Sequence, residues 1–364
     1  MKLSSLLEEK KLPNGLPSMA YNNMTCDYCP VSLDELNHLK NGISFISKEV
    51  FKKIVDYLHN LPNLQYVALT DFNEFFQTPE LTTFFLPELK KRGLPYVINS
   101  NGSVKPKHIE YYKDHQPKYL ILGVQTITEE HYYSNNRLDS LSWKEYVQRV
   151  ANIVKFFYEN CPETLISVEV AANHTINLWR KLTHSVENKN IPSEAEQMNY
   201  LSSFVNKLTE LTNIDFDLST NSKGRYGFQK VIAGTHDNRI IFGLKSFEDI
   251  TTFYDNIPVN HDPVCYADAI TFDTNGKVKM CCIDFRNTTE FANANQESMP
   301  VIFQRYLNNV DEMRSTGSPF SGCRNCKGFK SKSEKLFSLR KNYYPKLAKK
   351  IPAIRTLRNK LKTL

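Results

Sequence analysis

The chain has 364 residues, of which 41% are hydrophobic and 23% charged, as expected of a globular protein with one large domain and a smaller one. No run of 18 apolar residues occurs, which argues against a transmembrane segment, and residues 1–10 lack the apolar core of a secretion signal. We therefore expect a cytoplasmic protein.

The net charge of +7 is concentrated at one end of the chain. Residues 327–364 hold thirteen Lys or Arg and one acid, Glu334, so they carry +12 and the other residues carry −5. This distribution argues against a nucleic-acid groove in the main body. Apolar residues recur among the basic ones, interrupted by Pro345 and Pro352. The segment is predicted to be a basic amphipathic tail that binds an anionic surface or an acidic partner, or else a solvated helix that packs on its own domain.

Strand-like and helix-like segments alternate over the first 230 residues. Apolar segments at 65–70, 96–102, 119–125 and 165–170 predict strands, and 16–21 is a weaker candidate for the first strand. Amphipathic segments at 48–61, 81–92, 143–158 and 194–211 predict helices. Such alternation predicts a parallel sheet with right-handed crossovers. Functional residues are expected at the carboxyl ends of its strands, where Glu169 and Asn173 either face the mouth of the barrel or pack within it.

Seven of the eight cysteines fall into two groups. Cys26 and Cys29 form the first group. The second consists of Cys265, Cys281, Cys282, Cys323 and Cys326. In a cytosolic chain, clustered cysteines ligate metal or do redox chemistry more often than they form disulfides. The remaining cysteine, Cys161, is expected to be a buried small apolar residue.

The second cysteine group surrounds a predicted hairpin. Two short strands flank Asn275-Gly276, a dipeptide that favours a type I′ turn, and a helix is predicted at 301–314. Cys265, either Cys281 or Cys282, Cys323 and Cys326 would supply four thiolates, which suit a [4Fe-4S] cluster or tetrahedral zinc. Ligand softness does not separate iron from zinc, and unrelated buried cysteines are the alternative.

Together these residues resemble the radical SAM superfamily, specifically its members with a C-terminal SPASM-type iron–sulfur domain, over about residues 15–328. Residues 23–29 match the family's cluster loop after its first cysteine. Residues 69–75 stand where the family has Leu-Thr-Gly-x-Gly-Glu-Pro, and 100–102 where it has Thr-Asn-Gly. The hairpin and Cys323-x2-Cys326 follow the SPASM pattern, in which Cys281 is the expected ligand and Cys282 the alternative.

The resemblance implies an α/β fold with three parts. A partial (β/α)6 TIM-like barrel is expected over residues 1–240, a small cysteine-rich SPASM-like domain over 241–328, and the basic tail over 329–364. The barrel would hold a [4Fe-4S] cluster, and the second domain an auxiliary cluster.

The resemblance also implies a chemistry. S-adenosylmethionine would be cleaved reductively to a 5′-deoxyadenosyl radical that abstracts a substrate hydrogen, with an electron donor as partner. Tyr28 would lie near the adenine. Glu74 would help to hold the methionine amino group, and Asn73 and Asn101 would lie at the same site. SPASM members often modify peptides, which slightly favours a peptide substrate.

Three residues depart from the family pattern at the first cluster site. Asn22 replaces the first cluster cysteine, and a carboxamide is a poor ligand for iron. Asp71 and Asn73 replace two glycines that let the backbone approach the methionine. Two interpretations follow: an active radical SAM enzyme with a variant loop, and a catalytically degenerate homologue that acts as a binding or partner subunit with only the auxiliary metal site intact. A zinc-stabilised binding protein outside the family is the third.

Overall fold

The computed structural model describes sixteen parts of the chain. These are residues 12–15, 20–21, 46–61, 64–69, 72–77, 81–106, 108–125, 127–135, 141–173, 194–218, 229–247, 270–281, 284, 287–315, 320 and 323. They form an α/β fold around one ten-stranded sheet with the strand order β12-β11-β10-β1-β3-β5-β6-β7-β9-β8. The described residues contain no helix that is long and apolar enough to cross a membrane.

The sheet is mostly parallel, as the sequence predicts. Its strands are β1 (Leu12–Gly15), β3 (Leu64–Ala68), β5 (Tyr96–Ser100), β6 (Tyr119–Gln125), β7 (Leu165–Asn173), β8 (Gln229–Gly234), β9 (Ile240–Phe247), β10 (Thr271–Phe272), β11 (Lys277–Lys279) and β12 (Glu290–Asn293). All neighbours from β10 through β1 to β9 pair in parallel, and the pairs β8–β9, β10–β11 and β11–β12 are antiparallel. The six strands β1, β3, β5, β6, β7 and β9 lie side by side in chain order, which is the arrangement of a repeated β/α unit.

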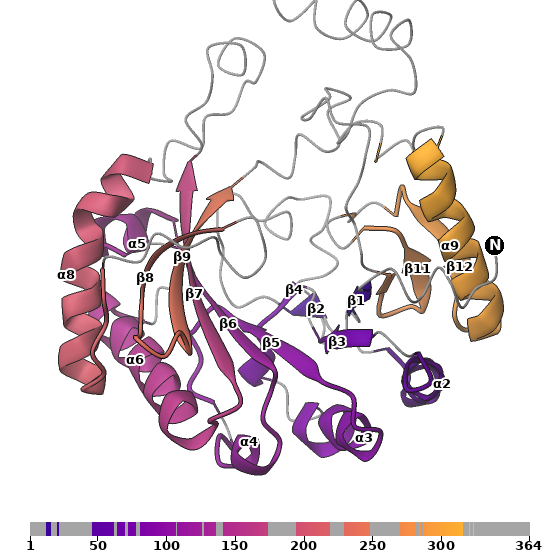
Figure 1. Cartoon of the computed structure of the whole chain (residues 1–364), viewed down its shortest axis with the longest axis horizontal. Helices are drawn as coiled ribbons and strands as arrows, with labels where there is room; N and C mark the ends of the chain where they lie inside the picture. Colours follow the sequence, from indigo (N-terminus) through magenta and orange to yellow (C-terminus); the bar gives the residue numbers. More distant parts are fainter. Residues whose placement is uncertain are drawn as a thin grey trace, which may run out of the picture.

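Helices cover the outer face of this sheet (Figure 1). They are α2 (Lys48–Leu58), α3 (Leu86–Lys91), α4 (Tyr111–Asp114), α5 (Glu129–Asn135), α6 (Trp143–Asn160), α8 (Glu194–Thr212) and α9 (Met299–Ser315). The four helices predicted in the first 230 residues are confirmed, although the one predicted at 81–92 is a π-helix at Leu81–Phe85 followed by α3. The start of α6 is fixed by a capping box between Ser142 and Glu145.

The first strand differs from its prediction. We expected it at 16–21, but β1 is Leu12–Gly15, and Ala20–Tyr21 forms a separate strand, β2, that pairs with β4 (Phe72–Asn73). The sequence of β1 contains Pro13 and Gly15, which are rare inside strands, so the apolar pattern did not reveal it. Pairing with β3 on one side and β10 on the other makes it a strand.

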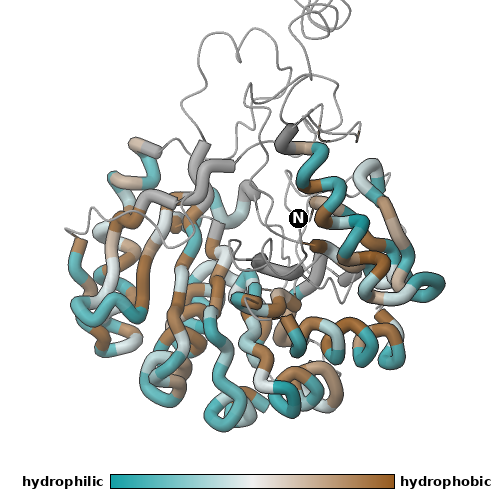
Figure 2. Tube along the Cα trace, turned by 45° about the vertical axis from the view of Figure 1, so that its right-hand side comes forward, coloured by the Kyte–Doolittle hydropathy of each residue, from teal (hydrophilic) through white to brown (hydrophobic). Residues whose placement is uncertain are grey.

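Side chains alternate between the two faces of the sheet, as strand geometry requires. The side chains that point to the helices form the hydrophobic core. On β6 and β7 these are Leu120, Leu122, Val124, Ile166, Val168 and Val170. We call the opposite side the inner face. Figure 2 shows apolar segments concentrated where helices and strands meet.

The predicted hairpin at Asn275-Gly276 is confirmed, but its turn is not type I′. Only Gly276 has a positive φ, of 75°, and its N–H donates to the Asp273 carbonyl 2.9 Å away. The turn is therefore type I followed by a left-handed glycine. The Asp273 Oδ1 atom selects this form by accepting the N–H groups of Asn275 and Lys277, both at 2.9 Å.

The hairpin continues the main sheet. β10 pairs in parallel with β1, and α9 packs against α2 through Tyr57 and Phe303, whose ring centroids lie 4.8 Å apart. Lys53 on α2 donates to the carbonyl of Ala294 at 2.7 Å and that of Glu297 at 2.6 Å. β9 begins at Ile240, where we placed the end of the barrel domain, and pairs with β7 in the same sheet. The basic tail at 329–364 lies outside the described residues.

Candidate functional site

A buried carboxylate joins the carboxyl ends of two strands. Glu74 directly follows β4, and its side chain is only 1% exposed. Its Oε1 atom accepts hydrogen bonds from the Ser100 hydroxyl at 2.6 Å and the Phe76 N–H at 3.3 Å. Its Oε2 atom accepts one from the Asn101 N–H at 2.8 Å. Ser100 ends β5, so this carboxylate connects the loop after β3 to the loop after β5.

Burial changes the acidity of this group. Removal from water raises the pKa of Glu74 to about 7, although the hydrogen bonds from Ser100, Asn101 and Phe76 pull it down. The carboxyl can therefore take up or release a proton near neutral pH, which is a property of groups at functional sites.

The turn after β5 requires a glycine. The Ser100 hydroxyl accepts the N–H of Gly102 at 3.0 Å, and Asn101 Oδ1 accepts the N–H of Ser103 at 2.9 Å. Gly102 has a φ of 73°, and a Cβ atom there would lie 2.8 Å from Cγ2 of Val150. Left-handed backbone and close packing on α6 together leave room only for glycine.

Tyr146 on α6 fixes the ends of β5 and β6, and sequence reasoning missed it. Its hydroxyl lies 2.9 Å from the Asn101 carbonyl and 3.2 Å from the Val124 carbonyl, so one proton is shared between two acceptors. The ring is fully buried and stacks on Tyr132 with centroids 4.9 Å apart. In the helical pattern of residues 143–158, Tyr146 occupies an ordinary core position, so the sequence does not indicate which groups its hydroxyl contacts.

β2 pairs with β4, the strand that comes directly before Glu74. Tyr21 at the end of β2 is in register with Asn73 at the end of β4. Tyr28, Cys26 and Cys29 lie outside the described residues, as do Asn22 and Asp71.

The second cysteine group is described in part. Cys281 is half-buried and follows the hairpin, and Cys323 is 6% exposed. Cys265, Cys282 and Cys326 lie outside the described residues, and no three metal-binding side chains come together among the residues that the structure places.

Asp284 shapes the loop after Cys281. Its buried carboxylate accepts four hydrogen bonds, from the N–H and hydroxyl of Thr288, both at 3.0 Å, and from the N–H and hydroxyl of Thr289, at 2.5 and 2.7 Å. Its carbonyl accepts the ammonium of Lys279, itself 3% exposed, at 3.0 Å. Asp284, whose N–H donates to the Cys281 carbonyl at 3.3 Å, is therefore anchored by its own buried side chain.

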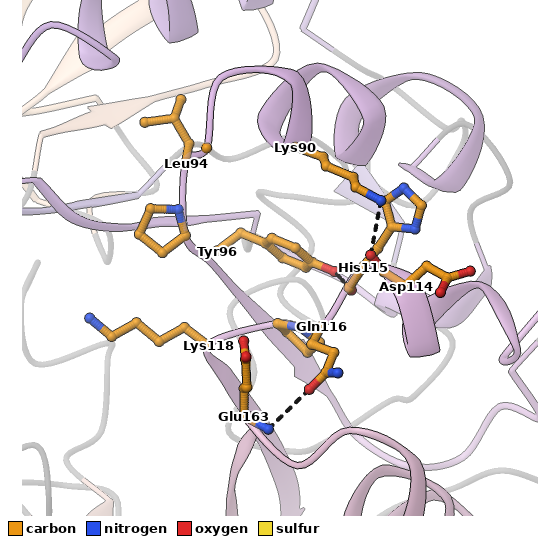
Figure 3. A pocket seen from close by; sticks show the side chains of 11 residues that line it. Lys90, Leu94, Tyr96, Asp114, His115, Gln116, Lys118 and Glu163 are labelled. Atoms are coloured by element: carbon orange, nitrogen blue, oxygen red, sulfur yellow. Dashed lines mark hydrogen bonds between the residues drawn. The ribbon is translucent and has the colours of Figure 1, made fainter.

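A cavity of about 360 Å³ lies at the opposite edge of the sheet (Figure 3). Tyr96 and Lys118, at the amino ends of β5 and β6, line it together with Lys90, His115 and Glu163. Lys90 and Lys118 donate to backbone carbonyls, both at 3.1 Å, and burial lowers the pKa of His115. Because parallel β/α folds place their chemistry at the carboxyl ends, we assign the candidate site to Glu74 and its neighbours instead.

The segment that contains these residues is similar to a known family. Residues 21–168 match the model of the radical SAM superfamily. The matched segment begins at the end of β2 and contains Glu74, Ser100, Asn101 and Tyr146. No curated protein matches the sequence.

Several solved structures are similar to this chain, and two of them reach a TM-score of 0.50. Native anSMEcpe with bound AdoMet is 11% identical, with 95% of this chain and 99% of that chain covered and a TM-score of 0.50. A histidine-tagged form of anSMEcpe with bound AdoMet is 12% identical, with 96% of each chain covered and a TM-score of 0.50. SuiB of Streptococcus suis bound to S-adenosylmethionine is 12% identical, with 90% of this chain and 72% of that chain covered and a TM-score of 0.48.

Proposed function

We propose that this chain is an iron–sulfur protein of the radical SAM type that uses S-adenosylmethionine for radical modification of a small substrate, with a peptide slightly favoured. The observation that carries the proposal is the carboxylate of Glu74, which is held between the loops after β4 and β5 and directly follows the strand that pairs with β2. The match of residues 21–168 to the superfamily supports it.

The residues at this edge fit a bound S-adenosylmethionine in specific ways. Only one hydrogen bond reaches Oε2 of Glu74 from the described residues, and a carboxylate oxygen has capacity for a second donor such as an amino group. Asn73 directly precedes Glu74 in the chain, and Asn101 reaches its carboxylate from the loop after β5. Tyr28 would lie by the adenine. Cys26 and Cys29 would hold the [4Fe-4S] cluster that supplies the electron for cleavage.

The auxiliary site is the second part of the proposal. Cys265, Cys281, Cys323 and Cys326 would hold a [4Fe-4S] cluster, with Cys282 as the alternative to Cys281, and zinc is the competing metal. Asp284 supports this assignment because its N–H donates to the Cys281 carbonyl at 3.3 Å while its carboxylate is anchored by Thr288 and Thr289, so the backbone at Cys281 has a fixed neighbour.

A specific residue favours a second candidate function. Asn22 stands where a third thiolate is needed, so the chain would be a catalytically degenerate homologue that binds a substrate or a partner protein with only the auxiliary metal site intact. The two candidates differ in iron content.

Anaerobic reconstitution separates the candidates. An active enzyme with two clusters should hold about eight iron atoms per chain, a degenerate homologue about four, and a zinc protein none. The variant Asn22→Cys restores the thiolate, and Asn22→Ser is its matched control. If only Asn22→Cys cleaves S-adenosylmethionine, the degenerate function stands. If the parent chain cleaves it, the enzyme stands.

Two further partners are proposed. An electron donor would supply the active form, because cleavage of S-adenosylmethionine is reductive. The basic tail at 329–364 would bind an anionic surface or an acidic partner because of its positive charge. Electrostatic binding weakens as salt is added, so an affinity that does not change with ionic strength would contradict the role of the tail.

A further inference from the structure

The inner face of the sheet becomes polar towards its carboxyl edge. Near the amino edge, Tyr66 and Tyr119 meet edge to face with ring centroids 5.8 Å apart. Further along, the side chains that point away from the helix-covered core include Asn99 on β5 and Ser167 and Glu169 on β7. Ligands of parallel β/α folds bind at this end, so this polarity lies where a substrate would approach.

Glu169 lies between two glycines. The strand register places it directly opposite Gly123 of β6 and directly opposite Gly243 of β9. Neighbouring strands are about 4.8 Å apart, so a side chain at either glycine would lie against Glu169. Neither of these two paired positions therefore places a side chain beside Glu169, which is 7% exposed and also interacts within the protein.

A second acceptor lies on the same face. The Oδ1 atom of Asn99 is buried and has no hydrogen-bond partner among the described residues. Asn99 on β5 pairs with Ile121 on β6, and Ile121 pairs with Ser167 on β7. Asn99 is therefore level with Ser167, two strands away, and Glu169 lies two residues further along β7. Two strand spacings are about 10 Å, a distance that side chains and a small ligand group can bridge.

We propose that Glu169 is a substrate-binding residue that accepts hydrogen bonds from a protonated amine of the substrate. A carboxylate has about four acceptor positions, so it can bind an amine in addition to any contact within the protein. Two acceptors on one face and one negative charge favour a cation with several N–H groups over an anion. This assignment deepens the proposed function, on which it rests, because it names the group that the substrate presents.

The test uses the full chain and a pair of probes that differ in one charge. Nα-acetyl-lysine methylamide carries the ammonium, and Nα-acetyl-norleucine methylamide has a similar shape without it. Saturation-transfer NMR titrations should show at least tenfold tighter binding of the lysine probe to the parent chain. Glu169→Gln should abolish this preference, and the exposed acid Glu163 provides the matched control, Glu163→Gln, which should keep it.

A second variant guards against loss of folding. Gly243→Ala adds a methyl group beside Glu169 without changing charge, and it should weaken lysine-probe binding at least threefold while the circular dichroism spectrum is unchanged. Equal binding of the two probes to the parent chain would overturn the proposal, and so would an undiminished preference in Glu169→Gln.

Failure of the proposed function would look different. Probe binding requires neither iron nor S-adenosylmethionine, so a chain that never cleaves S-adenosylmethionine can still prefer the lysine probe. Conversely, a chain that cleaves S-adenosylmethionine but binds both probes equally retains the proposed function and loses only the assignment of Glu169.

Discussion

The hydroxyl of Ser100 donates to Oε1 of Glu74 over 2.6 Å, across 26 positions of sequence. Both side chains are at least 95% buried, so this bond forms where water does not compete. It sets the distance between the loops after β4 and β5, and with it the shape of the candidate site. The state of the Glu74 carboxyl should therefore be visible in the stability of the whole domain.

We expect stability to fall as pH rises through neutrality because of Glu74. Its pKa is about 7 in the folded chain, against 4.5 as the ordinary value, so the folded state keeps a proton that the unfolded state releases. This contribution is complete below pH 4.5 and is lost as pH rises through 7, at most about 3 kcal/mol. Denaturant unfolding of the parent and of Glu74→Gln between pH 5 and 8 measures it.

The difference between the two proteins carries the result. As pH rises, the free energy of unfolding of the parent should fall relative to that of Glu74→Gln, because the glutamine does not ionise. The exposed acid Glu159 gives the control Glu159→Gln, which should follow the parent at every pH. Parallel curves for Glu74→Gln and the parent would show that the carboxyl does not titrate in this range.

Gly102→Ala should destabilise the fold more than Gly93→Ala. Both glycines have a positive φ, of 73° and 64°, which costs an alanine about 1 kcal/mol. Only at Gly102 would the new Cβ meet an atom, Cγ2 of Val150 at 2.8 Å, whereas nothing lies within 4 Å at Gly93. Overpacking should raise the total at Gly102 to about 3 kcal/mol, measured by urea denaturation.

A double variant tests the cause of this difference. Val150→Ala removes the atom that the new methyl group meets, so the cost of Gly102→Ala combined with Val150→Ala should be less than the sum of the single costs. Additive costs would mean that the backbone at Gly102, and not the contact with α6, limits the substitution.

Local pattern predicted β3, β5, β6, β7 and the hairpin, but it did not predict β8, β9 and β12, the position of the first strand or the type of the hairpin turn. The bounds of β6 match the strand predicted at 119–125, where the apolar run follows Pro117. β1 was misplaced because its residues become a strand through pairing with β3 and β10, which are distant in sequence. At the hairpin, the side chain of Asp273 overrode the preference of Asn-Gly.

The candidate site shows the same division. Motif resemblance indicated Glu74 and Asn101, and the structure adds that they are hydrogen-bonded to each other. Tyr146 could not be found from sequence because its partner Asn101 is 45 residues away and its ring satisfies a core position. Contacts between distant segments depend on the packing of helices on the sheet, which periodicity does not encode.

Tyr146→Phe should loosen the carboxyl edge while keeping the core intact. The phenylalanine retains the ring that packs on Tyr132 but leaves the carbonyls of Asn101 and Val124 without this donor. Loss of a buried donor costs about 1–2 kcal/mol, which urea denaturation resolves. Hydrogen exchange should accelerate at the ends of β5 and β6.

The control for this variant is another tyrosine. Tyr200 on α8 is 43% exposed, so Tyr200→Phe should change neither stability nor exchange. Equal effects of the two variants would indicate a general consequence of removing a phenol, and the bridging role of Tyr146 would be rejected.

Asp284→Asn should disrupt the loop after Cys281. The carboxylate accepts four hydrogen bonds, and an asparagine keeps only one acceptor oxygen, so its NH₂ group would face the donors of Thr288 or Thr289. We expect a loss of about 2–3 kcal/mol, because buried donors lose their partners. The exposed acid Asp215 supplies the control Asp215→Asn.

The same variant separates a structural loop from one that shapes a metal site. If Cys281 is a ligand, a displaced loop should lower the metal retained per chain after gel filtration, measured by inductively coupled plasma mass spectrometry, under conditions where the variant is still folded. Metal content equal to that of the parent, together with the expected loss of stability, would assign Asp284 to folding alone. Cys281→Ala tests the ligand itself: it should lower the metal content if Cys281 binds the metal, and unchanged metal content in this variant would show that the ligands lie elsewhere.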